Sequence, residues 1–313
     1  MTTAMAEPAM AEHVERPPKG IRGQGRQWHL LLAFVAPGMA FYLLFLIVPL
    51  LGTIFLSFTD WSGISFADIH VVGVSNYRAL AQDPIFRSAL VHTLVFVVFA
   101  ALLKTLVALV AALALNMRIR FSNVFRMVYV MPTVISAVVI GAVFSLALSP
   151  SLGLVNPLLT SIGLDRFTGE WLGSSTRAMP ILILLDVWQN FGIYMLIYIS
   201  KLLSIPEDLG EAARVDGATR WQETRRITIP LLRSTTGVVL LLACIDSLKV
   251  FTTVYIMTRG GPNHATEVLS TYAYSEAFEQ NRVGFGSAML VILLVIALIF
   301  AVVWFKLFKS RED

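Results

Sequence analysis

Five polar side chains interrupt two long apolar stretches of the sequence. Asp186, Gln189 and Asn190 lie in one stretch, and Asp246 and Lys249 lie in another. Ionisable groups inside a bilayer are costly and usually face a cavity or a partner group, and amides offer both donors and acceptors. We therefore predict that these residues line a substrate pathway for a polar solute. The alternative is that Asp246 pairs with Lys249 at i, i+3 and that the polar residues only hold helices together.

The two polar groups are predicted to lie at similar depth. Each comes roughly 8 to 12 residues from the outer end of its stretch, which is roughly 12–18 Å at 1.5 Å per helical residue. They could therefore line one cavity from two helices. Phe251 follows the second group, and its aromatic ring could pack against the apolar part of a solute. We include Phe251 in the predicted substrate pathway.

The patterns that carry catalysis do not occur in this sequence. It has no G-x-x-x-x-G-K-[ST], no G-x-S-x-G and no H-E-x-x-H. The five histidines are scattered, and Cys244 is the single cysteine, so no thiol cluster can hold a metal. We predict no catalytic residues, no metal site and no cofactor bound by this chain.

Composition indicates a membrane protein. Hydrophobic residues make up 57% of the 313 residues, charged residues make up 14%, and the mean hydropathy is +0.74. A soluble domain carries about a quarter charged residues, and about 20 apolar residues span a bilayer. We predict an all-α fold with six transmembrane helices. Because Pro37 and Pro49 lie in the first of them, we expect it to be kinked or tilted, or to start at the membrane interface. The predicted spans are 30–57, 88–115, 124–148, 178–200, 231–257 and 285–308.

The distribution of Lys and Arg predicts the orientation of these spans. Sixteen of the 24 basic residues fall in the two tails, the 116–126 turn and the 201–233 segment, and six fall on the other side. The positive-inside rule places both termini in the cytoplasm. Because no basic helix or aromatic platform accompanies the charge, nucleic-acid binding is not predicted. Residues 1–29 read as a disordered cytoplasmic tail, 30–308 as the membrane domain and 309–313 as a second cytoplasmic tail.

The segment 204–230 between the fourth and fifth spans is charged, and it is predicted to form a helix–turn–helix. Ser204 with Glu207 and Thr219 with Gln222 fit capping boxes. Gly217 permits the backbone reversal that ends the first helix near residue 215.

One face of this segment combines small residues with charges. Small side chains can sit deep in a groove of a partner, and carboxylates can offer polar contacts at its rim. The alternative is an ordinary cytoplasmic loop whose charges only fix the topology. The residues predicted to dock are Glu211, Ala212, Ala213, Asp216, Gly217 and Ala218.

The same segment resembles a known family motif. The stretch "EAARVDGATRWQETRRITIP" (211–230) is similar to the EAA loop of binding-protein-dependent ABC importer permeases. The stretches "LSFTDWSG" (56–63) and "TRGGP" (258–262) resemble the carbohydrate-uptake members. Thr224, Ser234 and Thr252 depart from residues that the family often carries, and the departures leave the docking arm unchanged.

The resemblance implies a permease subunit in a bacterial cell membrane, with the helix–turn–helix as the coupling loop. The implied partners are a second homologous permease, two copies of an ATPase that binds ATP-Mg, and an extracytoplasmic solute-binding protein that docks on loops 58–87 and 258–284. The implied activity is import of a sugar or oligosaccharide by alternating access. Two alternatives stay open: import of glycerol phosphates or glycerophosphodiesters, and a membrane scaffold or sensor.

Overall fold

The computed structural model describes residues 24–116 and 121–309. Within these residues the regular structure is helical, apart from an isolated β-bridge between Thr59 and Val71. The chain divides into two units, Met1–Leu51 and Gly52–Asp313. Four helices in the described part are long and apolar enough to cross a membrane, or six when each of two bent pairs counts as one span. The predicted all-α membrane fold is confirmed.

The first span is a continuous run of α1 (Gln24–Tyr42), the π-helical turn η1 (Leu43–Ile47) and α2 (Val48–Leu56). Pro49 has no N–H to donate to the backbone carbonyl four residues before it, and that carbonyl lies within the π-helical turn η1. The change from α-helix to π-helix is therefore the local effect of Pro49.

The predicted disordered tail is wrong for residues 24–29, because α1 begins at Gln24. The helical hydrogen bonding of the apolar segment continues back through Gln27, Arg26 and Gln24, which have good helix propensity, despite Gly25. Residues 1–23 of that predicted tail lie outside the described part of the chain.

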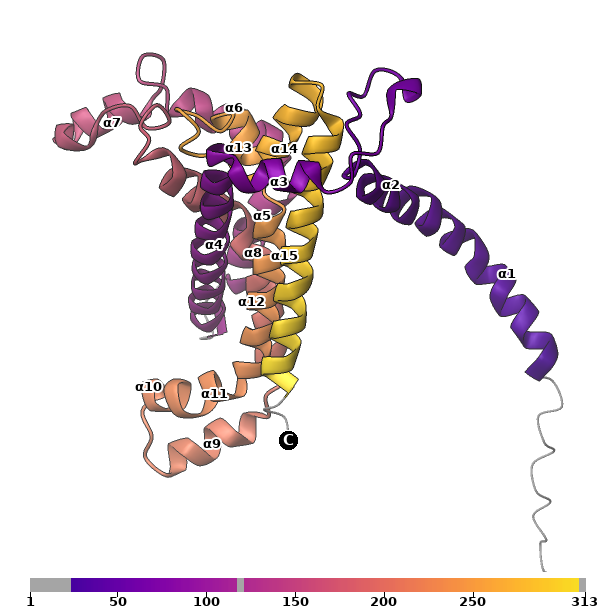
Figure 1. Ribbon diagram of the computed structural model, residues 1–313. Helices are drawn as coiled ribbons and strands as arrows, with labels where there is room; N and C mark the ends of the chain where they lie inside the picture. The colour runs from indigo at the N-terminus through magenta and orange to yellow at the C-terminus, as the bar shows by residue number, and fades with distance from the viewer. Residues whose placement is uncertain (1–23, 117–120, 310–313) are drawn as a thin grey trace, which may run out of the picture. The chain divides into compact units, whose positions relative to one another are not determined.

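Four long helices form the centre of the second unit (Figure 1). In α4, Ala101, Ala108 and Ala112 are fully buried against α8 and α12. Small residues let helix backbones approach closely, which is how helices associate in a membrane. The four helices are α4 (Pro84–Asn116), α8 (Ala178–Leu203), α12 (Arg233–Leu248) and α15 (Val283–Lys309).

The predicted third span is broken into α5 (Ser122–Val134) and α6 (Ala137–Ala147), which are bent by 92°. The backbone at the break is satisfied by α8. The Thr133 hydroxyl donates to the backbone carbonyl of Gln189 at 2.8 Å, and the side-chain Nε2 of Gln189 donates to the backbone carbonyl of Ile135 at 3.2 Å. A helix break inside a membrane requires such partners for its freed backbone groups. The length of the apolar run in the sequence did not indicate this break.

The predicted fifth span is wrong at its outer end. The helix α12 ends at Leu248, and residues 252–257 form a separate helix, α13 (Thr252–Met257). The hydroxyl of Ser270 donates to the Val250 carbonyl between them, so one freed backbone acceptor is paired. At the other end α12 follows α11 (Ile229–Leu231) with a 63° bend.

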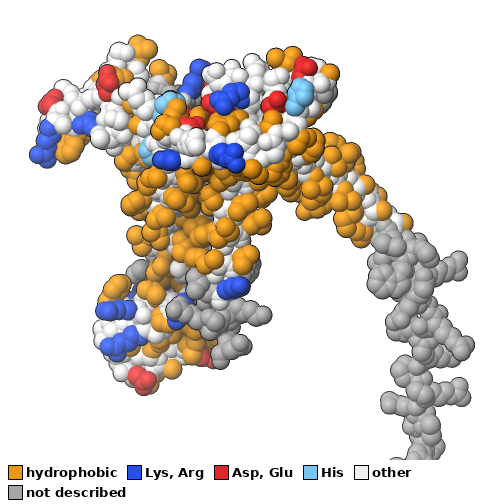
Figure 2. Space-filling view, viewed as in Figure 1, with side chains coloured by type: hydrophobic (Ala, Val, Ile, Leu, Met, Phe, Trp, Pro, Cys, Tyr) orange, Lys and Arg blue, Asp and Glu red, His pale blue; other side chains and the backbone are white. Residues whose placement is uncertain are grey.

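Short elements gather at the two ends of the long helices. Figure 2 shows apolar side chains over the spans and charged ones at both ends. At one end lie α9 (Glu207–Val215), α10 (Arg220–Glu223) and η4 (Thr224–Thr228), and at the other end lie α3 (Ser75–Gln82), α13 and α14 (Leu269–Tyr274) (Figure 1). The remaining elements are η2 (Phe66–Asp68), α7 (Val155–Ser161), η3 (Asp165–Phe167) and η5 (Ser275–Glu279).

Candidate functional site

A charged cluster joins three of the long helices. Lys104 of α4 places its Nζ 2.6 Å from Asp246 Oδ2 of α12 and 2.8 Å from Asp186 Oδ2 of α8. It also donates to Ser247 Oγ at 3.2 Å. The Lys104 side chain is fully buried, and a buried cation needs such partners because its desolvation is costly.

The alternative in which Asp246 pairs with Lys249 is wrong. Asp246 is paired with Lys104 instead, because the extended side chain of Lys104 reaches α12 from the facing helix. Lys249 is the C-cap residue of α12, with φ −93° and ψ 10°. A residue outside the helix no longer continues the i, i+3 face, so sequence spacing alone misassigned the partner.

Lys104 was absent from the predicted substrate pathway. The sequence could have identified it, because Lys104 is a single cation within an otherwise apolar stretch. An ionisable residue inside a span is a candidate functional residue by default. The sequence predicted that Asp186 and Asp246 lie at similar depth, and in the structure both carboxylates contact the Lys104 amine.

The cluster holds two carboxylates and one amine. Asn190 Nδ2 donates to Asp186 Oδ1 at 2.9 Å, which gives the more buried carboxylate a second partner. The side chain of Asp186 is 10% exposed and that of Asp246 is 46% exposed. Asp246 is therefore the member whose carboxylate is open to further hydrogen bonds, while Asp186 is largely shielded from water.

The other predicted pathway residues lie outside the charged cluster. Gln189 is buried and uses its amide at the break between α5 and α6, which fits the bracing alternative. Lys249 is exposed. The Phe251 ring lies 5.2 Å from both the Tyr255 and the Tyr274 rings, so it belongs to an aromatic group on α13 and α14.

The 204–230 segment folds as two short helices joined by a turn. The capping box of Thr219 and Gln222 is present, with Thr219 N–H to Gln222 Oε1 at 2.8 Å and Gln222 N–H to Thr219 Oγ1 at 3.3 Å. Gly217 has φ +80°, the left-handed conformation that ends a helix.

The predicted capping box of Ser204 and Glu207 is wrong. Ser204 donates its hydroxyl to the Lys201 carbonyl at 2.8 Å, because it is the C-cap residue of α8. The N-cap of α9 is Pro206, which has no side-chain oxygen to accept from an N–H.

The predicted docking face is open in the structure. Ala213 and Ala218 are half-buried, and Glu211, Ala212, Asp216 and Gly217 are exposed. Two large apolar side chains flank these residues: Val215 is 88% exposed and Trp221 is 68% exposed. Exposed apolar side chains grouped with charges are typical of a protein-interaction surface.

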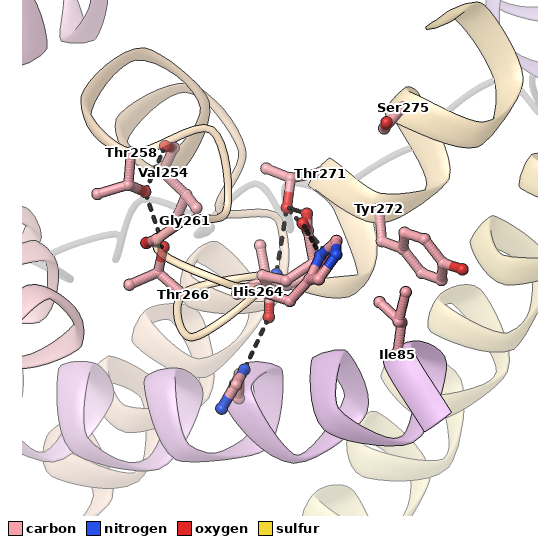
Figure 3. Close-up of polar contacts among 12 residues, drawn as sticks. Ile85, Val254, Thr258, Gly261, His264, Thr266, Thr271, Tyr272 and Ser275 are labelled. Atoms are coloured by element: carbon pink, nitrogen blue, oxygen red, sulfur yellow. Dashed lines mark hydrogen bonds and ion pairs between the residues drawn. The ribbon is translucent and has the colours of Figure 1, made fainter. Parts of the chain in front are cut away.

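At the opposite end, the loop between α13 and α14 is held by a polar network (Figure 3). Thr271 donates to Glu267 Oε1 at 2.6 Å, and His264 Nδ1 lies 3.1 Å from Glu267 Oε2. Gly260 has φ +79°, and a Cβ there would overlap the Glu267 carboxylate. The loop therefore has a fixed shape that depends on glycine at this position.

This loop region adjoins the loop after the first span. Tyr272 donates to Asp83 Oδ2 at 2.6 Å, and the Gly284 N–H donates to the Trp61 carbonyl at 3.1 Å. Burial, and then this bond to Asp83, raise the pKa of Tyr272, so its hydroxyl stays protonated and donates. These two bonds join the segments 58–87 and 258–284. In residues 24–116 and 121–309, no three His, Cys, Asp or Glu side chains meet as a metal site would require.

Comparison with known proteins gives consistent matches. Residues 104–312 match the family model described as binding-protein-dependent transport system inner membrane component. The chain is 36% identical over 282 residues to the probable ABC transporter permease protein YurN of Bacillus subtilis, covering 90% of this chain and 96% of that protein. It is 33% identical to the diacetylchitobiose uptake system permease protein NgcF of Streptomyces coelicolor, covering 88% and 80%.

A solved structure is similar over nearly the whole chain. It is a bacterial alginate ABC transporter in complex with an alginate pentasaccharide-bound periplasmic protein. The match has a TM-score of 0.77 and 26% identity, and it covers 94% of this chain and 98% of the matched chain.

Proposed function

Because the chain belongs to the family of binding-protein-dependent transport system inner membrane components, we propose that it forms the translocation pathway of an ATP-driven importer for a sugar or oligosaccharide. It is a non-catalytic permease subunit. The observation that carries the proposal is its similarity, over 94% of the chain, to a subunit of a transporter solved with its sugar-loaded periplasmic protein. The cargo named for NgcF, a diacetylchitobiose, favours sugars over glycerol phosphates.

The proposed complex contains this chain, a second homologous permease, two ATPase subunits that bind ATP-Mg, and an extracytoplasmic binding protein. Transport proceeds by alternating access. ATP and the loaded binding protein each favour the outward-facing state, because a ligand shifts an equilibrium only through its differential affinity for the two states.

The charged cluster is proposed to face the cargo through Asp246, with Asp186 and Asn190 behind it. The half-exposed carboxylate of Asp246 can accept hydrogen bonds from sugar hydroxyls, while Lys104 fixes its position at 2.6 Å. Lys249 and Phe251, at the other end of the 246–251 turn, stay in the proposed pathway. Gln189 is retained with a bracing role through its bond to the Ile135 carbonyl.

The proposed coupling site is the open face of α9 and the following turn. The exposed side chains of Glu211, Ala212 and Asp216, with Gly217, would seat in a cleft of the ATPase subunit together with Ala213 and Ala218. The fixed turn at Gly217 and the capping box at Thr219 would transmit movement from the ATPase to α12 through α10 and α11.

The binding protein is proposed to dock on the surface formed by segments 58–87 and 258–284. The Tyr272–Asp83 and Gly284–Trp61 bonds make these loops one unit. The proposed location is a bacterial cell membrane with both termini in the cytoplasm, an orientation that the distribution of basic residues supports. In that orientation this surface would lie outside and α9 inside.

The test is ATPase activity and uptake by the complete complex in proteoliposomes. We expect ATP hydrolysis to rise when the loaded binding protein and a sugar such as diacetylchitobiose or an alginate oligosaccharide are present, and labelled sugar to accumulate. Stimulation by glycerol phosphate alone would contradict the sugar assignment. A complex whose ATPase responds to no solute would contradict the importer assignment and support the scaffold or sensor alternative.

A further inference from the structure

A groove of about 590 Å³ lies between α8 and α12, near the end that leads into α9. It has a polar part and an apolar part, and no acidic side chain lines it. Its lining residues are Ile193, Leu196, Ile197, Ser200, Lys201, Ser204, Ser234, Thr235 and Val238.

The polar part of the groove is nearest to α9. Four of its lining residues there carry hydroxyls, and Lys201 adds an amine. Hydroxyls both donate and accept hydrogen bonds, as sugar hydroxyls do. Further into the span, the groove is lined by isoleucine, leucine and valine. Their side chains do not compete with the hydroxyls for hydrogen bonds.

Helical spacing connects the groove to the charged cluster. On α8, Asn190, Ile193, Ile197 and Ser200 follow one another at three and four residues, which is one face of a helix. Asn190 is bonded to Asp186 of the cluster, so this face starts at the cluster and ends in the groove.

The facing side of α12 gives the same connection. Asp246, Leu242, Val238 and Thr235 follow at four, four and three residues. Leu242 is 42% exposed, Val238 is 52% exposed, and the Asp246 side chain is 46% exposed. At 1.5 Å per residue this face is about 16 Å long from Asp246 to Thr235.

The position of Asp246 decides what covers this face. The groove hydroxyls alone do not exclude lipid, because Ser and Thr can bond to their own helix backbone. A half-exposed carboxylate on the same face does exclude it, since ionisable groups within a span face a bundle interior or a water-filled cavity. A face that ends in Asp246 is therefore not covered by acyl chains.

From this continuity we infer that the groove between α8 and α12 is a hydrated route by which a polyhydroxylated cargo passes between the charged cluster and the α9 end. The inference rests on the proposed function for the identity of the cargo. It adds to that function the residues of the second half of the route: Ser200, Ser204, Ser234, Thr235 and Val238.

Cysteine labelling of the assembled complex tests the route. Cys244, the single cysteine, is replaced by alanine, and Val238→Cys or Ser200→Cys is introduced. Val110→Cys on α4 is the matched control, because Val110 is 58% exposed, lies outside the groove and is six residues beyond Lys104 toward the same end. Inside-out vesicles are treated with a membrane-impermeant methanethiosulfonate.

We expect Val238→Cys and Ser200→Cys to react at least roughly tenfold faster than Val110→Cys, because the reactive thiolate forms only where water is present. Saturating sugar should slow both reactions. Co-purification with the partner subunits identifies variants that assemble.

Equal labelling rates in assembled variants would overturn the route. Labelling of Val238→Cys only by a lipid-soluble maleimide would overturn it in favour of an acyl chain, and protection by the second permease alone would overturn it in favour of a protein contact. Fast aqueous labelling that no sugar slows would leave the hydrated route standing and contradict the proposed sugar cargo.

Discussion

Lys104 and Asp246 are 142 residues apart in the sequence, and their Nζ and Oδ2 atoms lie 2.6 Å apart. Their contact links α4 to α12, the long helix that follows the predicted coupling loop. Because Asp186 of α8 shares the same amine, three spans are joined at one point. Movement of α12 against α4 must either carry this cluster along or break it.

Lys104→Met should destabilise the protein by about 3–5 kcal/mol, the typical effect of leaving a buried charge without its partner. The thermal unfolding midpoint of the detergent-solubilised complex measures the effect. The control is Lys104→Met combined with Asp186→Asn, which removes the more buried carboxylate as well and should recover part of the loss. An unchanged midpoint in Lys104→Met would show that the cluster does not hold the spans together.

Asp246→Asn should lower sugar uptake roughly tenfold, the effect expected for one lost charge-assisted hydrogen bond. Basal ATPase activity and complex assembly should be unchanged. Asp246→Glu keeps the charge and is expected to keep most of the uptake. Uptake at the original level in Asp246→Asn would remove Asp246 from the cargo pathway.

Glu211→Lys should abolish the stimulation of ATPase activity by the loaded binding protein, because it reverses the charge on the exposed face of α9. ATPase assays on the reconstituted complex provide the measurement. Ser161→Lys adds a charge at an exposed position on α7, which belongs to none of the proposed interfaces, and should respond normally. Normal stimulation in Glu211→Lys would show that coupling does not pass through this face.

The sequence predicted the elements better than it predicted their partners. Apolar length located the six apolar segments but not the break in the third or the outer end of the fifth. The Thr219–Gln222 box and Gly217 located the turn, because these signals are local. The break between α5 and α6 depends on Gln189, more than 50 residues away, and the partner of Asp246 lies on another helix. Such contacts are set by which faces pack together, and no local pattern reports them.

Ser204 shows how a local pattern can mislead as well. Its spacing to Glu207 fits a capping box, yet α8 extends to Leu203 and Ser204 is its C-cap residue. The capping box does not form because α8 is longer than predicted, and its additional backbone hydrogen bonds outnumber the one that a cap would supply.

Thr219→Ala should therefore loosen the start of α10, whereas Ser204→Ala should not loosen the start of α9. Loss of a serine or threonine cap costs about 1 kcal/mol, which corresponds to roughly fivefold faster local amide exchange near Gln222. Hydrogen–deuterium exchange on the purified complex measures both variants. Faster amide exchange at Glu207–Leu209 in Ser204→Ala would show that Ser204 does cap α9, contrary to the structure.

Gly192→Ala should destabilise the contact between α5 and α8. A Cβ at Gly192 would overlap the Tyr129 carbonyl oxygen and come within 3 Å of the Val130 backbone, so α5 must shift. Overpacking of this kind costs about 1–3 kcal/mol, and the thermal unfolding midpoint should fall accordingly.

The matched control for Gly192→Ala is Gly52→Ala, also in a membrane helix, where an added Cβ meets nothing within 4 Å. There the loss of glycine's backbone freedom is the main effect, so alanine should stabilise by about 0.5–1 kcal/mol. The two variants differ by the same single methyl group and are expected to shift the midpoint in opposite directions. If Gly192→Ala raised the midpoint as Gly52→Ala does, the close approach of α5 to α8 would be wrong. The support that Gln189 gives to the break between α5 and α6 would then also lose its basis, since it depends on the same approach.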